Sequence, residues 1–213
     1  MKTILCYGDS NTWGYNPDGS GRYPKDIRWP SVLETELGAS FDIIAEGLNG
    51  RTTVWDDPVR GEYRNGKKYL LPCLHSHKPI DWVILFLGSN DLKSRFSVNS
   101  HEIAQGVEAL VDIINQSGTG PNMRPPRVLV LIPPPVLIPK DGEKYDYLIS
   151  EYEQAVKKSQ QFASAFTAIL EGKCHLLDTS KLIKTSEIDG MHLDPDSHAI
   201  LGRELASYIK QRL

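Results

Sequence analysis

The stretch ILCYGDSNTWGY, from Ile4 to Tyr15, joins a short apolar run to a polar triplet that begins with glycine. The run ILCY is a candidate buried strand, and Gly8-Asp9-Ser10 follows it directly. In open parallel sheets, ligands bind beyond the carboxyl ends of the strands, because loops and helix amino termini converge there. The sequence therefore places the hydroxyl of Ser10 where it would meet a ligand.

Strand-like and helix-like segments alternate along the whole chain. Four further apolar runs are candidate strands: FDIIAEG near Ile43, DWVILFLGS near Ile84, RVLVLIPPP near Val130 and CHLLDTS near Leu176. Between and after them lie segments with helical spacing: WPSVLETELG, YLLPCLHSHKP, HEIAQGVEALVDIINQ, YLISEYEQAVKKSQQFASAFTAILEGK and PDSHAILGRELASYIKQRL. We expect Ser100 to cap the third helix, and Gly38 and Gly172 to end the first and fourth. This alternation predicts one α/β domain over residues 1–213, with a parallel sheet covered by helices on both faces.

Composition and charge exclude several classes of partner. The net charge is −3, and the 24 lysines and arginines are spread along the chain, so the sequence predicts a small-molecule partner and no nucleic acid. No run is long enough for a transmembrane helix, and the apolar run after Lys2 is too short for a signal peptide. Cys6, Cys73 and Cys174 are far apart and odd in number, which favours reduced buried thiols. We therefore expect a cytoplasmic protein with no membrane partner.

Polar residues collect just after the predicted strands. Gly8-Asp9-Ser10 follows the first strand, residues 47–53 (GLNGRTT) follow the second, Gly88-Ser89-Asn90-Asp91 follows the third, and Asp189-Gly190-Met191-His192 comes after the fifth. A hydroxyl, a glycine, an amide and a carboxylate–imidazole pair are thus expected at one edge of the sheet.

These four blocks, GDS, NG before RTT, GSND and DGMH, resemble in type and order those of the SGNH (GDSL-type) hydrolase superfamily. The resemblance covers nearly the whole chain. The segments ILCYGDSNTWG, EGLNGRTT, YLLPCLHSHKPIDWVI and PPP further resemble the bacterial arylesterase and acyltransferase branch, whose known members cleave small aryl and short-chain acyl esters. The resemblance implies a three-layer α/β/α, flavodoxin-like fold with a five-stranded parallel sheet in the order 2-1-3-4-5. It also implies no metal or organic cofactor, and assembly into homo-oligomers, which is frequent in this branch.

The resemblance assigns catalytic roles to named residues. Ser10 is the nucleophile, His192 is its base and Asp189 orients His192, because a serine hydroxyl is a poor nucleophile until a correctly held imidazole removes its proton. The oxyanion hole is formed by the backbone N–H groups of Ser10 and Gly50 and by the side chain of Asn90. Glycine at position 50 lets the backbone approach the substrate closely.

The substrate pocket is less well defined by the sequence. Many members of the family carry leucine after the nucleophile, whereas this chain has Asn11, so Asn11 is a candidate substrate-binding residue and the shape and polarity of the acyl pocket are open. Trp13 is a candidate pocket residue, and Tyr15, Trp29 and Trp55 either line the pocket or belong to the core. Arg51 either binds substrate or forms an ion pair with Asp56 or Asp57. Asp9 is expected to support its loop by hydrogen bonds.

Other motifs have simpler interpretations. His198 is expected to be structural, and His75 and His77 to lie in a solvated loop, since no third metal ligand is evident. GEYRNGKK, from Gly61 to Lys68, nearly matches a phosphate-binding loop, but Lys68 replaces the required hydroxyl and no strand precedes it, so nucleotide binding is not expected.

The sequence therefore predicts a serine esterase that hydrolyses small aryl or short-chain acyl esters through an acyl-serine intermediate, with acyl transfer to alcohols as a second reaction. A carbohydrate acetylesterase is the alternative, followed by a lysophospholipase or thioesterase. A binding module without turnover is the alternative of a different class.

Overall fold

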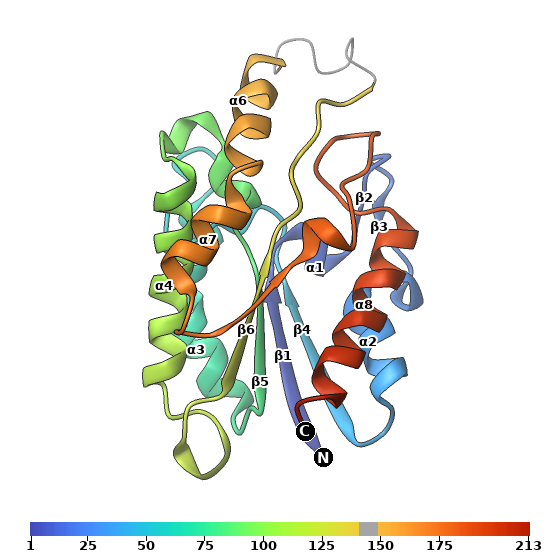
Figure 1. Ribbon diagram of the computed structural model, residues 1–213, viewed down its shortest axis with the longest axis vertical. Helices are drawn as coiled ribbons and strands as arrows, with labels where there is room; N and C mark the ends of the chain where they lie inside the picture. The colour runs from blue at the N-terminus through green and yellow to red at the C-terminus, as the bar shows by residue number, and fades with distance from the viewer. Residues whose placement is uncertain (141–148) are drawn as a thin grey trace.

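The computed structural model describes residues 1–140 and 149–213, and its centre is a sheet of five parallel strands (Figure 1). These strands are β1 (Lys2–Gly8), β4 (Phe41–Gly47), β5 (Trp82–Phe86), β6 (Arg127–Ile132) and β7 (His175–Asp178). Their order across the sheet is β4-β1-β5-β6-β7. Numbered along the chain, this is the expected order 2-1-3-4-5, so the predicted fold class is confirmed.

Helices cover both faces of the sheet (Figure 1). On one side lie α2 (Trp29–Leu37) and α8 (Pro195–Lys210), and on the other lie α3 (Gly66–His77), α4 (Ser100–Gln116) and α7 (Phe162–Leu170). Helix α6 (Ile149–Ser159) lies above the carboxyl edge of the strands. The smaller elements are α1 (Ser10–Trp13), the hairpin strands β2 (Tyr15–Asn16) and β3 (Gly21–Arg22), and the 3-10 helices η1 (Lys25–Ile27), η2 (Glu62–Arg64), η3 (Ser89–Leu92), η4 (Ser94–Phe96), η5 (Pro121–Met123) and η7 (Thr179–Lys181).

The apolar strands owe their continuous hydrophobicity to burial on both faces. In β1, Ile4 and Cys6 pack with α2 and α8, whereas Leu5 and Tyr7 pack with α3, α4 and α7. Successive side chains of a strand point to opposite faces, so a strand between two helix layers needs apolar residues at every position. The runs quoted above therefore mark the central strands well.

Three details of the predicted helices differ from the structure. Asn99, not Ser100, caps α4: its side chain accepts hydrogen bonds from His101 N and Glu102 N, while Ser100 Oγ donates to Lys158 O. The long fourth segment is two helices, α6 and α7, and its first two residues, 147 and 148, lie outside the described residues. Third, α3 begins at Gly66, before the predicted segment. Gly38 caps the end of α2 with a φ of +76°, as expected.

The break between α6 and α7 has a local cause. Ser159, the last residue of α6, donates through Oγ to Val156 O and accepts from Val136 N at 3.0 Å. This side chain ties the end of α6 to the segment that follows β6. Hydrogen bonds of this kind compete with a continuing helix, and the apolar periodicity of the sequence does not report them.

The three cysteines are free, with Cys6 and Cys73 buried, as expected. Among the described residues, no helix is both long and apolar enough to cross a lipid bilayer.

His198 has the predicted structural role, in the first turn of α8. Its side chain is fully buried, accepts from Trp29 N through Nδ1 at 3.3 Å and packs edge-on against Tyr23. Burial disfavours the charged imidazolium and lowers the pKa of His198 to about 4. The ring is therefore neutral in the folded protein at neutral pH.

This burial predicts an acid-dependent loss of stability. Below about pH 6.5 the unfolded chain protonates His198 but the folded chain does not, so acidification to about pH 5 lowers the free energy of unfolding by about 2 kcal/mol. In His198→Asn, whose side-chain oxygen can still accept from Trp29 N, this contribution should vanish. Denaturant unfolding across this pH range measures it, with exposed His101→Asn as the control. Parallel profiles for wild type and His198→Asn would contradict this assignment.

Candidate active site

Ser10 stands at the carboxyl end of the central strand β1. Gly8 ends the strand, Asp9 caps α1 by accepting from Asn11 N at 2.9 Å, and Ser10 is the first residue of that helix. A Cβ at Gly8 would lie 2.1 Å from Thr12 Oγ1, so only glycine lets the chain turn this tightly from strand into helix. The turn presents the Ser10 hydroxyl at the edge of the sheet.

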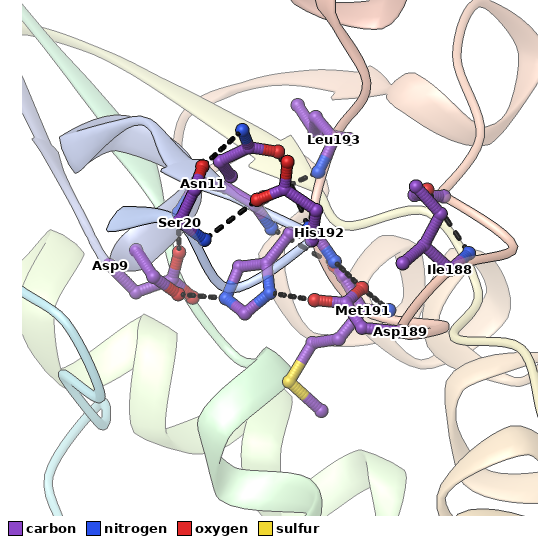
Figure 2. Close-up of polar contacts among 12 residues, drawn as sticks. Asp9, Asn11, Ser20, Ile188, Asp189, Met191, His192 and Leu193 are labelled. Atoms are coloured by element: carbon purple, nitrogen blue, oxygen red, sulfur yellow. Dashed lines mark hydrogen bonds and ion pairs between the residues drawn. The ribbon is translucent and has the colours of Figure 1, made fainter. Parts of the chain in front are cut away.

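The segment before α8 brings an imidazole to that hydroxyl. His192 Nε2 lies 2.9 Å from Ser10 Oγ, and Nδ1 of the same ring lies 2.5 Å from Asp189 Oδ2. The other Asp189 oxygen accepts from Met191 N and His192 N (Figure 2). Serine, histidine and aspartate thus form one continuous line of hydrogen bonds.

The environment of Asp189 keeps its side chain ionised. Burial favours the neutral acid, but the hydrogen bonds and charge of His192 outweigh it, so the pKa of Asp189 lies below its ordinary value. An ionised carboxylate accepts the Nδ1 proton of His192 and leaves Nε2 free to accept from Ser10. The turn depends on Gly190, whose φ is +72° and where a Cβ would lie 2.0 Å from Leu137 O.

Asn11 holds the main chain on both sides of His192. Its side chain donates through Nδ2 to Met191 O at 3.3 Å and accepts through Oδ1 from Leu193 N at 3.0 Å (Figure 2). With 3% of its surface exposed, Asn11 points into the protein and not into the substrate pocket. The suggested substrate-binding role of Asn11 is therefore replaced by one in positioning the histidine segment.

The residues expected to form an oxyanion hole share one pocket with Ser10 and His192. This pocket has a volume of about 220 Å³ and includes Gly50, whose φ is +80°, and Asn90, in η3. Asn90 Nδ2 donates to Asp9 Oδ2 at 3.3 Å, so Asp9 orients the amide. Asp9 thereby has the supporting role expected of it, and burial raises its pKa.

Arg51 has a third role that neither sequence alternative described. Its guanidinium donates to Gly8 O at 2.9 Å and to Glu46 O, and lies over the ring of Tyr7 at 4.1 Å. Arg51 is buried and ties the ends of β1 and β4 together. The expected carboxylate partners bind other cations: Asp56 pairs with Lys68, and Asp57 faces Lys93 and Arg95.

The aromatic residues divide between pocket and core. Trp13 packs under Arg22, 4.7 Å from its guanidinium carbon, and is not among the residues that line the pocket. Tyr15 lines the pocket instead, with its ring 4.4 Å from that of His192. Trp29 is fully buried in the core beside α2 and α8, and Trp55 is partly buried against the core on the opposite face of the sheet.

The sequence did not predict the cationic side chains that line this pocket. Its remaining lining residues include Arg60, Arg64, Lys93 and Arg95, together with Asn49 and Met191. The four cations come from the loops that follow β4 and β5. No motif joins them, so only the folded arrangement reveals the cluster.

One group of potential metal ligands occurs among the described residues, away from the residues that line the pocket. Glu46, Cys73 and His77 have ligand atoms within 4.8 Å of one another, and His77 Nε2 lies 3.1 Å from Glu46 Oε1. His75 and His77 both lie in the last turn of α3, so the predicted solvated loop is wrong. Burial raises the pKa of Cys73 to about 12, so the thiol is protonated at neutral pH and is a poor metal ligand in this state.

Known proteins share this architecture. The native aryl esterase of M. smegmatis is 36% identical with a TM-score of 0.90, and the match covers 100% of both chains. Est24, a carbohydrate acetylesterase from Sinorhizobium meliloti, is 34% identical with a TM-score of 0.91 over 100% of both chains. A lipase/acylhydrolase from Enterococcus faecalis, at 19% identity and a TM-score of 0.61, shares the fold. The comparison with curated proteins found no match.

A family model also matches the part of the chain that forms this site. The sequence model of the GDSL-like lipase/acylhydrolase family matches residues 6–200, which include Ser10, Asn90, Asp189 and His192. The chain therefore belongs to the GDSL-like lipase/acylhydrolase family.

Proposed function

We propose that this protein is a serine esterase that hydrolyses small aryl and short-chain acyl esters through an acyl-serine intermediate. The proposal rests on the line of hydrogen bonds from Ser10 Oγ through His192 to Asp189. Ser10, at one end of this line, lines an open pocket. The similarity to the M. smegmatis aryl esterase supports the choice of substrate class.

In the proposed first step, Ser10 Oγ attacks the ester carbonyl while His192 Nε2 takes the hydroxyl proton. Asp189 stabilises the imidazolium that forms, because its carboxylate accepts the Nδ1 proton. The same imidazolium then protonates the departing alcohol or phenol oxygen. The acyl group stays on Ser10.

The negative charge on the carbonyl oxygen needs hydrogen-bond donors already in place. We assign this role to the N–H groups of Ser10 and Gly50 and to Asn90 Nδ2, each worth roughly two to three powers of ten in rate. Support comes from their shared pocket and from the bond to Asp9 that orients the Asn90 amide.

The second step reverses the first. His192 takes a proton from water, which attacks the acyl carbon, and the acid leaves as Ser10 recovers its proton. An alcohol in place of water gives a new ester, so acyl transfer needs no further catalytic group.

Carbohydrate acetylester hydrolysis is the second candidate, and the similarity to Est24 supports it. Both activities use the same catalytic groups and differ in the alcohol that leaves. Phenyl acetate and a fully acetylated monosaccharide carry the same acyl group, so their kcat/KM ratio separates the two candidates. We expect the phenyl ester to be the better substrate.

We further propose that the protein is a single domain, lies in the cytoplasm, has no nucleic-acid partner and forms a homo-oligomer. A continuous sheet supports one domain over residues 1–213. Free thiols support a cytoplasmic location. The acidic net charge supports the absence of a nucleic-acid partner, and the resemblance of the sequence to arylesterases supports a homo-oligomer.

Removing the Ser10 hydroxyl should abolish turnover and leave the fold intact, because the side chain lies in a surface pocket. We expect Ser10→Ala to lose at least about three powers of ten in kcat toward phenyl acetate, with an unchanged circular dichroism spectrum. Ser20→Ala, a loop serine that does not line the pocket, is the matched control. Full activity in Ser10→Ala would exclude Ser10 as the nucleophile.

Replacing Asn11 by leucine should slow catalysis without weakening substrate binding. Asn11→Leu keeps the branch at Cγ and the number of side-chain non-hydrogen atoms but removes the bonds to Met191 O and Leu193 N, so His192 loses its fixed position. We expect kcat to fall about tenfold with KM changed less than about twofold, and stability to fall by about 1–3 kcal/mol from the unpaired backbone groups. Steady-state kinetics and denaturant unfolding measure both.

The control for Asn11→Leu is Asp81→Ala, which removes the hydrogen bond that Asp81 accepts from Thr3 N. This bond lies near the amino-terminal end of β1, away from the pocket. It should lower stability and leave kcat unchanged. If Asn11→Leu affects only KM, Asn11 belongs to substrate binding after all.

A further inference from the structure

Four cationic side chains surround the opening at Ser10. Arg60 and Arg64 come from the loop after β4, and Lys93 and Arg95 from the loop after β5. The whole chain carries 27 acidic and 24 basic residues and is therefore acidic. The positive charge around this opening thus has the opposite sign to the net charge of the protein. A neighbouring pocket of about 290 Å³ shares Arg60, Lys93, Arg95 and Met191 with the first and extends the positive surface.

The cations have little compensating negative charge. Asp57 lies 3.8 Å from both Lys93 Nζ and Arg95 Nη1, and it accepts hydrogen bonds from Val59 N and Arg60 N. In the part of the chain that the structure describes, neither Arg60 nor Arg64 has a carboxylate at ion-pair distance. One buried carboxylate therefore faces the whole cluster.

Most of the donors in the cluster have no partner among the residues that the structure describes, which leaves them available to a ligand. An ammonium has three N–H donors and a guanidinium has five. Over residues 1–140 and 149–213, the only side-chain hydrogen bond that these four cations donate runs from Arg64 Nε to Tyr63 Oη at 3.3 Å. Burial, with repulsion from Arg95 and Arg64, lowers the pKa of Lys93 despite the attraction of Asp57.

Of the other acidic side chains that the structure describes, none lies at ion-pair distance from these cations. Asp189 is committed to His192, and Glu151 is an exposed residue of the neighbouring pocket. Asp9 and Asp91 are buried beneath the site, and burial raises the pKa of Asp91 to about 7. Arg64 lies against the backbone of Gly50, since a Cβ there would stand 2.0 Å from Arg64 Nη1. Positive charge thus lies next to Gly50, a residue that we assign to the oxyanion hole.

We propose that the ester bound in this pocket carries a negatively charged group, a carboxylate or a phosphate, that Arg60, Lys93 and Arg95 hold while its carbonyl lies at Ser10. The inference rests on the proposed ester hydrolysis and narrows its substrate class. Guanidinium and ammonium groups with unfilled donors are the usual protein partners of these anions. Water adds across the ester bond, and the charged group leaves unchanged on one of the two products.

The test compares esters that differ only in charge. On the alcohol side, 4-acetoxybenzoate is paired with 4-acetoxybenzamide; on the acyl side, the phenyl monoester of adipic acid is paired with phenyl adipamate. We expect kcat/KM to favour the anion by about tenfold or more in at least one pair, and salt to reduce this preference. Arg60→Gln/Arg95→Gln should lower the preference about tenfold.

The matched control is Arg124→Gln/Arg203→Gln, which removes the same charge from exposed positions elsewhere and should keep the preference. Binding of both ester pairs to Ser10→Ala, measured by calorimetry, tests the anion site without turnover. Equal binding of anion and amide in both pairs, or equal kcat/KM in both pairs, overturns the inference. If the neutral esters are still hydrolysed, the proposed function stands; if no ester is hydrolysed but the anion binds more tightly, the proposed function fails and the anion site stands.

Discussion

The hydrogen bond between Ser10 Oγ and His192 Nε2 joins two segments 182 residues apart, and the proposed chemistry depends on it. The fold brings those segments together because β1 lies inside the sheet and the turn before α8 crosses its carboxyl edge. Asn11 adds two bonds between the same segments. The position of the imidazole is therefore a property of the whole domain core, which holds β1 and α8 in place.

Charge around the site is arranged in two layers. Beneath the loop of Ser10 and Asn90, the buried carboxylates of Asp9 and Asp91 bind neighbouring N–H and hydroxyl groups, with Asp91 accepting from the backbone and side chain of Thr53. Burial raises the pKa of both acids, that of Asp91 to about 7. Around the opening, the cations keep free donors. The lower layer orients the loops, and the upper one presents positive charge to a ligand.

Much of this arrangement was predictable from the sequence. The five strands were recognisable because each is buried on both faces and is therefore apolar at nearly every position. The blocks that contain Ser10, Gly50, Asn90 and His192 were recognisable because each directly follows one of those strands or precedes the last helix. Strand order followed from the family resemblance and not from the periodicity.

The remaining features depend on contacts between distant loops. The asparagine after Ser10 suggested a pocket residue, because nothing in the sequence relates position 11 to the backbone of residues 191 and 193. Arg51 suggested a partner among nearby acids, but its actual acceptors are carbonyl groups at the ends of two strands. The cations of the pocket lie in separate loops at irregular spacing. In each case the partner is set by tertiary structure, which local sequence patterns do not encode.

The central claim is that Ser10 Oγ is a nucleophile activated by His192. A 4-nitrophenyl alkylphosphonate tests it most directly, since attack by the serine releases nitrophenolate and leaves an adduct that does not hydrolyse readily. Mass spectrometry of the protein and its peptides should find a single phosphonyl group on the peptide that contains Ser10, and His192→Ala should react far more slowly. An unlabelled protein, or a label on another residue, would contradict the account.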